Sequence, residues 1–282
     1  MPQYQAAGLI AIDWESEELP TLPIIAQKLF PLIGSSNISA KELSDIIRQD
    51  PSITMKILQI VNSALYMLSI EVTSLKHAIV LLGAREVQHI AISSILAQRF
   101  LTVPYEVANY AENLWRHSIA TAVIAQHLTN GGENESLYTL GLLHDVGWIV
   151  LIAQAPTIYL AMARDIKGDI KVIERQWGTD HELWGAKLAQ KWELPKSFQQ
   201  VALRHHDPLA MTDPPSYLLK VHLANYLATK IGFKAFEGEE VKDLSPEVME
   251  YLKLDNEKLE KLIEQASQKS NHIKELWRLL VV

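Results

Sequence analysis

Residues 137–155 read LYTLGLLHDVGWIVLIAQA, the most apolar stretch of the chain. The stretch stops at Pro156, which cannot continue a helix, and its low polarity predicts the buried central helix of a lobe. His144 and Asp145 lie in the middle of it. Burying these two side chains without partners would cost roughly several kcal/mol, so either a metal ion or a hydrogen-bonded His–Asp pair must satisfy them. The two residues alone leave both explanations open.

On either side of this stretch, apolar residues recur at helical spacing, and no convincing alternating strand pattern appears. We therefore predict an all-α fold. The first helices are marked by cap signals, namely Ser39 with Glu42, Asp50 with Pro51, and Ser74 ahead of a helix that ends at Gly83. Later helices are expected at 84–100, 105–128, 157–166, 169–177, 180–192, 195–205 and 215–232.

A break in the helical pattern at residues 102–104 separates two helical lobes, which we expect to span residues 17–103 and 104–235. Within the second lobe, residues 130–132 read Asn-Gly-Gly and should form a turn. Residues 236–282 are expected to form a C-terminal helical tail.

The tail carries both a start signal and an apolar stripe. Ser245 followed by Pro246 predicts a helix beginning there. The stripe is narrow and consists of Leu259, Leu262, Ile263 and Ala266. It favours a helix docked on the rest of the protein over one that binds a partner.

The composition excludes several classes of protein. The 282 residues carry a net charge of −7, which attracts phosphate backbones poorly, so we expect no general nucleic-acid binding. The absence of cysteine excludes disulfides, zinc–thiolate sites and thiol nucleophiles. No basic start followed by an apolar run marks a signal peptide, and no run of 18 apolar residues predicts a membrane span. We expect a cytoplasmic protein without a membrane partner.

The histidines are informative through their placement: His117, His144, His181, His205 and His206. Singly, each has an ordinary explanation, such as a core histidine or an imidazole that complements a helix end. Jointly, on five predicted helices and beside Asp145, they predict one or two divalent ions, for which iron, manganese, zinc and nickel are all suitable. Adjacent helical residues diverge by about 100°, so only one of His205 and His206 should face a given ion unless two ions lie side by side.

Six segments resemble the HDOD (HD-related output domain) family, a branch of the HD superfamily of helical metal-dependent phosphohydrolases. In the first lobe they are LPTLP (19–23), DPSITMKILQIVNSA (50–64) and SLKHAIVLLG (74–83). In the second lobe they are GLLHDVG (141–147), HELWGA (181–186) and RHHDP (204–208). The likeness spans roughly residues 17–230, and the 50–64 segment is fairly specific to this branch. It implies that the second lobe is an HD-type helical bundle.

The resemblance also implies a set of metal ligands. A first ion would be held by His117, His144, Asp145 and a later aspartate, whose position is taken here by Asn225. An amide oxygen can ligate but brings no charge, so Asn225 is a weak candidate. In two-metal relatives Asp145 would bridge to a second ion, which is held by histidines that match His181, His205 and His206.

Two departures bear on catalysis. Related cyclic-dinucleotide phosphodiesterases carry a lysine where this chain has Trp148, and a Gly-Tyr-Pro loop after the position of His206, where this chain continues Asp-Pro-Leu. Arg116 and Arg204 are candidate phosphate contacts, although an arginine beside a ligand is as often a structural ion-pair partner. The retained ligands favour a bound metal, whereas the missing phosphate-handling groups disfavour turnover. We assign no catalytic residue.

Two functions follow from these observations. The favoured one is a cytoplasmic signalling or regulatory module with a metal-binding second lobe, weak or no catalytic activity, and a first lobe that contacts a signalling protein whose identity the sequence does not give. The alternative is a metal-dependent phosphohydrolase that acts on a nucleotide or cyclic dinucleotide.

Overall fold

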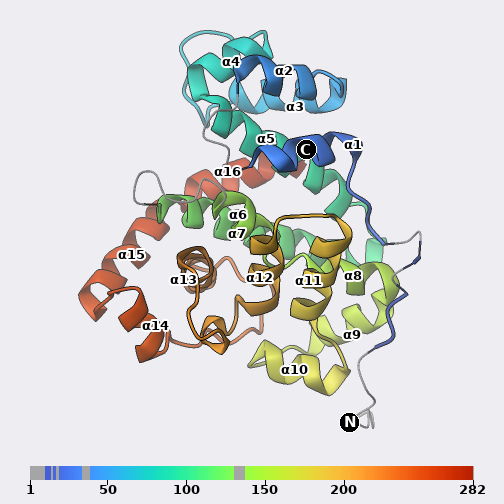
Figure 1. The fold of residues 1–282 in the computed structure, drawn as a ribbon, viewed down its shortest axis with the longest axis vertical. Coiled ribbons are helices and arrows are strands. Elements are labelled where there is room, and N and C mark those ends of the chain that lie inside the picture. Colours follow the sequence, from blue (N-terminus) through green and yellow to red (C-terminus); the bar gives the residue numbers. More distant parts are fainter. Residues whose placement is uncertain (1–9, 14, 17–18, 34–38, 130–136, 282) are drawn as a thin grey trace.

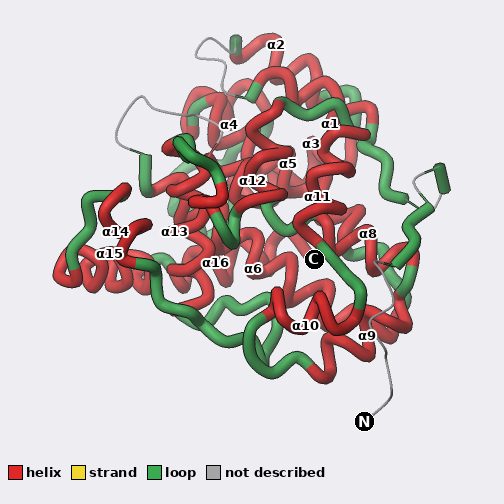
Figure 2. The backbone as a smooth tube through the Cα atoms, turned by 60° about the horizontal axis from the view of Figure 1, so that its bottom comes forward, coloured by secondary structure: helices red, strands yellow, loops and turns green. Residues whose placement is uncertain are grey.

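The computed structural model describes residues 10–13, 15–16, 19–33, 39–129 and 137–281. Within these ranges every regular element is a helix, and the β-type pairing is limited to an isolated bridge between Gly168 and Glu239. Figure 2 accordingly draws helices and loops and no strand in the described part of the chain. The predicted all-α fold class is confirmed.

The first lobe is built from short helices with well-formed ends. Its described elements are α1 (Ile24–Leu29), η1 (Phe30–Leu32), α2 (Ala40–Ile47), α3 (Pro51–Val61), α4 (Leu75–Leu82) and α5 (Ala84–Phe100). The side chains of Ser39, Asp50 and Ser74 each accept a backbone N–H from the first turn of the helix that follows, as the cap signals predict. Gly83 separates α4 from α5 with a φ of 86°, which glycine adopts readily.

The second lobe surrounds the apolar stretch. Its described elements are η2 (Tyr105–Val107), α6 (Ala108–His127), α7 (Leu137–Leu143), α8 (Gly147–Gln154), α9 (Pro156–Asp165), α10 (Ile170–Trp177), α11 (His181–Lys191), α12 (Lys196–Arg204), η3 (Pro208–Ala210) and α13 (Ser216–Lys230). The helices predicted between residues 157 and 232 are confirmed to within two residues at each end. The turn predicted at 130–132 lies outside the described residues.

The single central helix predicted over residues 137–155 is wrong, because the chain forms two helices there. Between α7 and α8 the backbone turns, with Val146 N–H donating to Leu143 O and Trp148 N–H to Asp145 O over three residues rather than four. As a result, His144 and Asp145 belong to the turn between the two helices and to neither helix. The polar pair therefore lies in a buried turn and not on a helix face.

Gly147 explains how that turn comes close to α11. A Cβ atom at residue 147 would lie 1.8 Å from the carbonyl oxygen of His181 and 2.6 Å from the backbone nitrogen of Gly185. Only glycine permits the start of α8 to touch the start of α11 in this way. The contact brings the turn that holds Asp145 next to His181.

The C-terminal tail packs on both lobes. It consists of α14 (Pro246–Tyr251), α15 (Asn256–Gln268) and α16 (Ser270–Val281). The α15 stripe packs on the protein core, as the docked-helix interpretation predicts. Helix α16 lies between the lobes, against α3, α5 and α6, and Lys56 Nζ donates to Leu279 O at 3.2 Å (Figure 1). The tail therefore ties the first lobe to the second.

By length and composition alone, Leu137–Gln154 could span a bilayer, and the sharply bent pair α4–α5 passes the same test as a broken span. However, 89% of the Leu137–Gln154 segment is buried inside the protein. A segment buried to this extent has the character of a core element of the second lobe.

A half-buried carboxyl group lies where the first lobe meets the second. Glu86 of α5 accepts a hydrogen bond from Tyr66 Oη at 2.7 Å, and His89 Nδ1 lies 3.9 Å from its other oxygen. His89 in turn stacks on Tyr138 of α7, with ring centroids 4.1 Å apart. Burial by itself raises the pKa of Glu86, but His89 and Tyr66 outweigh it and lower the pKa to about 2.

Replacing Glu86 with glutamine should remove a pH-dependent part of the stability. Because the folded-state pKa is depressed, the contribution is complete above pH 4.5 and is lost as the pH falls toward about 2. A lowering of this size corresponds to about 3 kcal/mol. Urea unfolding should therefore show Glu86→Gln less stable than wild type near pH 7 and equally stable near pH 2. Glu71→Gln, an exposed glutamate of the same lobe, is the control, and a pH-independent difference for Glu86→Gln would refute the account.

Candidate metal centre

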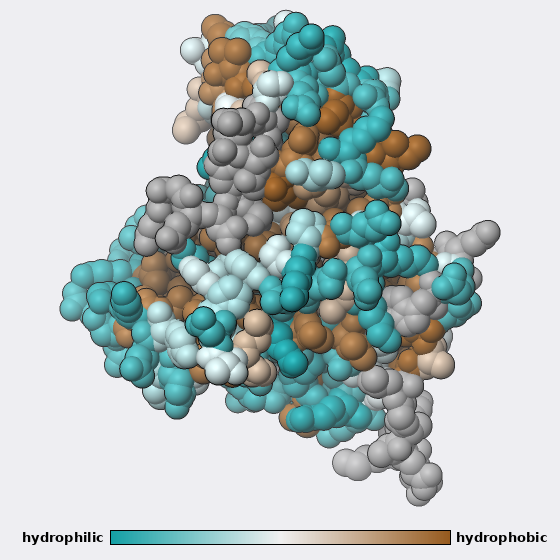
Figure 3. All heavy atoms as spheres, in the orientation of Figure 1, coloured by the Kyte–Doolittle hydropathy of each residue, from teal (hydrophilic) through white to brown (hydrophobic). Residues whose placement is uncertain are grey.

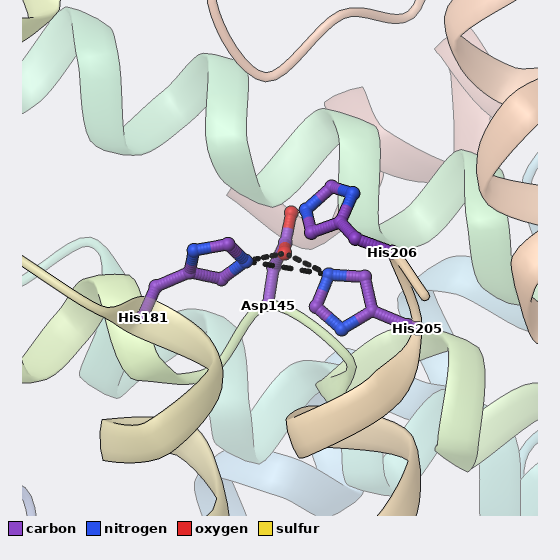
Figure 4. A group of neighbouring side chains, drawn as sticks. All are labelled: Asp145, His181, His205 and His206. Atoms are coloured by element: carbon purple, nitrogen blue, oxygen red, sulfur yellow. Dashed lines mark hydrogen bonds and ion pairs between the residues drawn. The ribbon is translucent and has the colours of Figure 1, made fainter. Parts of the chain in front are cut away.

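The carboxylate of Asp145 lies between two groups of histidines. On one side, its Oδ2 atom is 3.6 Å from His117 Nε2 and 3.3 Å from His144 Nε2. On the other side, its Oδ1 atom is 3.4 Å from His181 Nε2 and 3.1 Å from His205 Nε2, and His206 completes this group (Figure 4). The structure thus brings together all the strong ligands predicted from the sequence, with Asp145 shared between the two groups.

Four of these imidazoles are anchored through their outer nitrogen. His117 Nδ1 donates to Phe233 O at 2.7 Å, and His144 Nδ1 to Gly141 O at 2.7 Å. His205 Nδ1 lies 3.1 Å from the carbonyl oxygens of both Val201 and Ala202, and His181 Nδ1 lies 2.7 Å from Glu174 Oε1. A carbonyl oxygen can only accept, so in the three rings held by carbonyls the proton resides on Nδ1, and the neutral ring leaves Nε2 bare. Outer partners of this kind orient histidines that bind metals.

The inner nitrogens and the carboxylate form a set that a cation would satisfy. The Nε2 atoms of His117 and His144 are 3.2 Å apart, and those of His181 and His205 are 3.3 Å apart, so each pair can share only one proton. Asp145 Oδ1 is buried and accepts no well-formed hydrogen bond from the described residues. Bare imidazole nitrogens around one carboxylate oxygen are a donor set for divalent transition metals, so the residues fit the predicted group.

The protonation states suit the same role. Burial raises the pKa of Asp145, but His144, His181 and His205 outweigh burial and hold the pKa well below its ordinary range. Burial and the neighbouring His144 lower the pKa of His117 to about 4. Burial lowers the pKa of His181, but Glu174 and Asp145 raise it to about 10, so this ring holds a proton in the metal-free protein. A bound ion would displace that proton.

His205 and His206 correct the expectation that only one of two adjacent residues faces a given ion. Helix α12 ends at Arg204, so the 100° rotation between helical neighbours no longer applies to the two histidines. Their ring centroids are 4.2 Å apart, and both rings lie in the group around Asp145 Oδ1. The expected placement on five helices is also wrong: His117 lies inside a helix, whereas the others lie at helix ends or in turns.

A cleft of about 550 Å³ borders the site, with His206 among its lining residues. Arg204 and Asn225, two residues predicted to belong to the site, line the same cleft as His206. Arg116 does not line it. Its guanidinium donates to Asn113 Oδ1 at 2.6 Å and lies over the Trp277 ring of α16, so its observed contacts are structural.

Sequence reasoning missed the acidic residues behind His181. Glu174 accepts from both the backbone N–H and the Nδ1 atom of His181, and Lys171 Nζ lies 3.2 Å from its other oxygen. Lys171 also lies 2.6 Å from Glu182. Trp148, at the position of the phosphodiesterase lysine, stacks flat on His181 with centroids 4.5 Å apart. The role of Glu174 could not be predicted from the sequence, because it depends on how the end of α10 is placed beside the start of α11.

Glu174→Gln should destabilise the metal-free protein. The amide removes the charge that pairs with Lys171 and His181 at a side chain only 1% exposed, and such a loss costs about 3 kcal/mol. Chemical unfolding with chelator at pH 7 measures it. Glu193→Gln, an exposed residue just after α11, should change stability by less than about 0.5 kcal/mol. Unchanged stability of Glu174→Gln would mean that this carboxylate does not hold His181.

Comparisons with known proteins agree with the architecture. A superposition on an HDOD domain protein of unknown function from Geobacter sulfurreducens gives a TM-score of 0.74 at 24% identity and covers 95% of this chain and 93% of that one. A "putative signal transduction protein" from Marinobacter aquaeolei VT8 gives 0.75 at 21% identity, covering 99% and 64%. A "putative phosphohydrolase" from Shewanella amazonensis SB2B gives 0.66 at 23% identity, covering 93% and 95%. At these identities the likeness shows a shared fold.

Among curated proteins, the chain is 24% identical over 200 residues to an uncharacterized protein of Treponema pallidum (strain Nichols). That match covers 68% of this chain but only 38% of the relative, so the chain corresponds to well under half of that protein. The family model of the HDOD domain matches residues 19–208, which include both halves of the motif set and the whole histidine cluster. The chain belongs to the HDOD domain family.

Proposed function

We propose that this protein is a cytoplasmic signalling or regulatory module that binds one or two divalent ions in its second lobe and has weak or no catalytic activity. One observation carries the proposal. The carboxylate of Asp145 lies between two groups of imidazole nitrogens, and four of the five rings are held from behind by carbonyls or by Glu174. Such preorientation is what a metal centre requires of its protein.

Each group would hold one ion, with iron, manganese, zinc and nickel all suited to its donors. The first group consists of His117, His144 and Asp145, and the second of Asp145, His181, His205 and His206. When bound, the ions would supply positive charge able to polarise an oxygen ligand. The chain's own contribution is to fix the rings, to keep Asp145 ionised and to exclude water from the buried side of the cluster.

Features around the cluster argue against efficient turnover of a phosphate substrate. Trp148 packs flat on His181 and offers no charge to a phosphate. The ligands other than His206 are at most 4% exposed, so access from the cleft passes by His206. The wall of the cleft also carries more acidic than basic residues, which disfavours an anion: Asp169, Glu182, Asp207, Glu239, Glu240 and Asp243 against Lys171, Arg175, Arg204 and Lys242.

One observation favours the alternative, a metal-dependent phosphohydrolase acting on a nucleotide or cyclic dinucleotide. Arg175 and Arg204 line the cleft that borders His206, and guanidinium groups bind phosphate well. Protein loaded with manganese or iron can be screened against nucleotides, cyclic dinucleotides and generic phosphodiesters. Turnover that disappears in Asp145→Ala would establish this alternative in place of our proposal.

The first lobe supports a protein partner for the module. It exposes large apolar side chains, with Met67 86%, Val80 78% and Met55 67% accessible. Figure 3 shows hydrophobic surface on this lobe, at the top of the view. Exposed apolar surface is typical of protein interaction sites. We therefore propose that the first lobe contacts a signalling protein, while the tail couples this lobe to the metal-binding one.

The bridging role of Asp145 predicts how metal content responds to substitution. Protein purified without chelator and loaded with Mn²⁺ should retain up to two ions per chain by elemental analysis. Asp145→Asn should lose both ions, because its oxygens serve both groups, whereas His117→Ala should lose one. His127→Ala, an exposed histidine on the same helix, should keep both. An Asp145→Asn variant with the metal content of wild type would contradict the proposal.

A further inference from the structure

The segment that follows α13 is pinned against the metal centre. The carbonyl oxygen of Phe233 anchors His117, and the Phe236 ring packs edge-on against Trp148 with centroids 5.1 Å apart. A Cβ atom at Gly238 would lie 1.8 Å from Ile166 O, so glycine is needed for this close approach. Gly168 N–H donates to Gly238 O at 3.1 Å, and Glu240 N–H donates to Gly168 O at 3.0 Å. Glu239, between these contacts, is fixed in place.

One oxygen of the Glu239 carboxylate lacks a hydrogen-bond partner among the described residues. This oxygen, Oε2, is buried. Glu239 lines the cleft together with His206 and Asn225. Burial and then the charge of Asp145 raise the pKa of Glu239 to about 7, against the lowering effects of a backbone hydrogen bond from Phe236 and of Lys234 and His181. A cation nearby would relieve both the burial and the repulsion.

The predicted metal centre is short of negative charge. Its tight ligand groups contain Asp145 and neutral imidazoles, and a divalent ion carries more charge than one carboxylate balances. The aspartate that the HD resemblance implies is Asn225 here, a neutral amide on α13. Glu239 reaches the same cleft from the next segment of the chain, beyond the residues 19–208 that the family model matches.

We infer that Glu239 supplies the second negative charge of the metal centre, in place of the aspartate that Asn225 replaces. The inference rests on the proposed function, because it requires the site to bind metal. Glu239 acts as a balancing charge on the cleft side, outside the tight cluster around Asp145. Its contribution is therefore to the affinity of the ions and not to the geometry of the imidazoles.

The affinity of the full-length protein for Mn²⁺ tests this inference, with the electron paramagnetic resonance signal of the free ion as the readout. Glu239→Gln keeps the shape of the side chain and removes its charge, so it should weaken Mn²⁺ binding about 10- to 100-fold. Glu237→Gln, an exposed glutamate of the same segment, should bind as wild type does. Moving the charge back to α13 with Asn225→Asp in the Glu239→Gln background should restore the affinity to within about threefold of wild type.

The outcomes separate this inference from the proposed function. Without metal, Glu239→Gln should unfold at the same denaturant concentration as wild type or a higher one, because a carboxylate with one buried, unsatisfied oxygen has been neutralised. If wild type binds Mn²⁺ and Glu239→Gln binds it equally well, the inference fails and the proposed function stands. A weakened Glu239→Gln that Asn225→Asp does not rescue also overturns the inference. If wild type binds no Mn²⁺, both fail.

Discussion

An ionised carboxylate buried among imidazoles is the constraint on which the second lobe depends. Asp145 is 4% exposed, and burial alone would favour its neutral form, yet the surrounding histidines keep it charged. A charge at that depth requires matching donors or cations, because its desolvation is expensive. The lobe meets this requirement by aiming four inner imidazole nitrogens at one group. The carboxylate therefore links ligands that come from α6, from α11 and from the end of α12.

Helix ends, and not helix faces, provide most of the ligands. The last turn of a helix leaves carbonyl oxygens without intrahelical partners. In α7 and α12 the oxygens of Gly141 and Ala202 receive the outer nitrogens of His144 and His205, and Val201 O, which also accepts the backbone N–H of His205, lies equally close to the His205 ring. The same imidazole thus satisfies a helix terminus on one side and presents a bare nitrogen on the other. This double use explains why a cluster of histidines is compatible with a stable, almost entirely apolar core.

The sequence predicted what depends on local signals. Caps at Ser39, Asp50 and Ser74 are formed by neighbouring residues, so the helices they begin could be placed to within a residue or two. Apolar periodicity, by contrast, cannot distinguish one buried helix from two joined by a buried turn, and the break at His144 was missed for that reason. The paired orientation of His205 and the residue after it was missed because the rotation of about 100° between helical neighbours was applied at a helix end, whereas α12 ends at Arg204.

The ligand set was found from the order of its residues and the family resemblance, whereas its supporting groups depend on tertiary folding. Glu174 meets His181 only because α10 folds back on α11, and Glu239 meets the cleft only because its segment is pinned beside Gly168. Neither carboxylate has a distinctive sequence spacing. Likewise, no residue near Arg116 in the sequence indicated that its guanidinium would lie over the ring of Trp277, far along the chain.

The central claim is that one carboxylate lies between two ion-binding groups, and anomalous diffraction from crystals of the manganese-loaded protein tests it most directly. The account predicts two anomalous peaks that flank Asp145, one beside His117 and His144, the other beside His181, His205 and His206. Crystals that contain manganese only elsewhere, or that show no peak at this carboxylate, would contradict it.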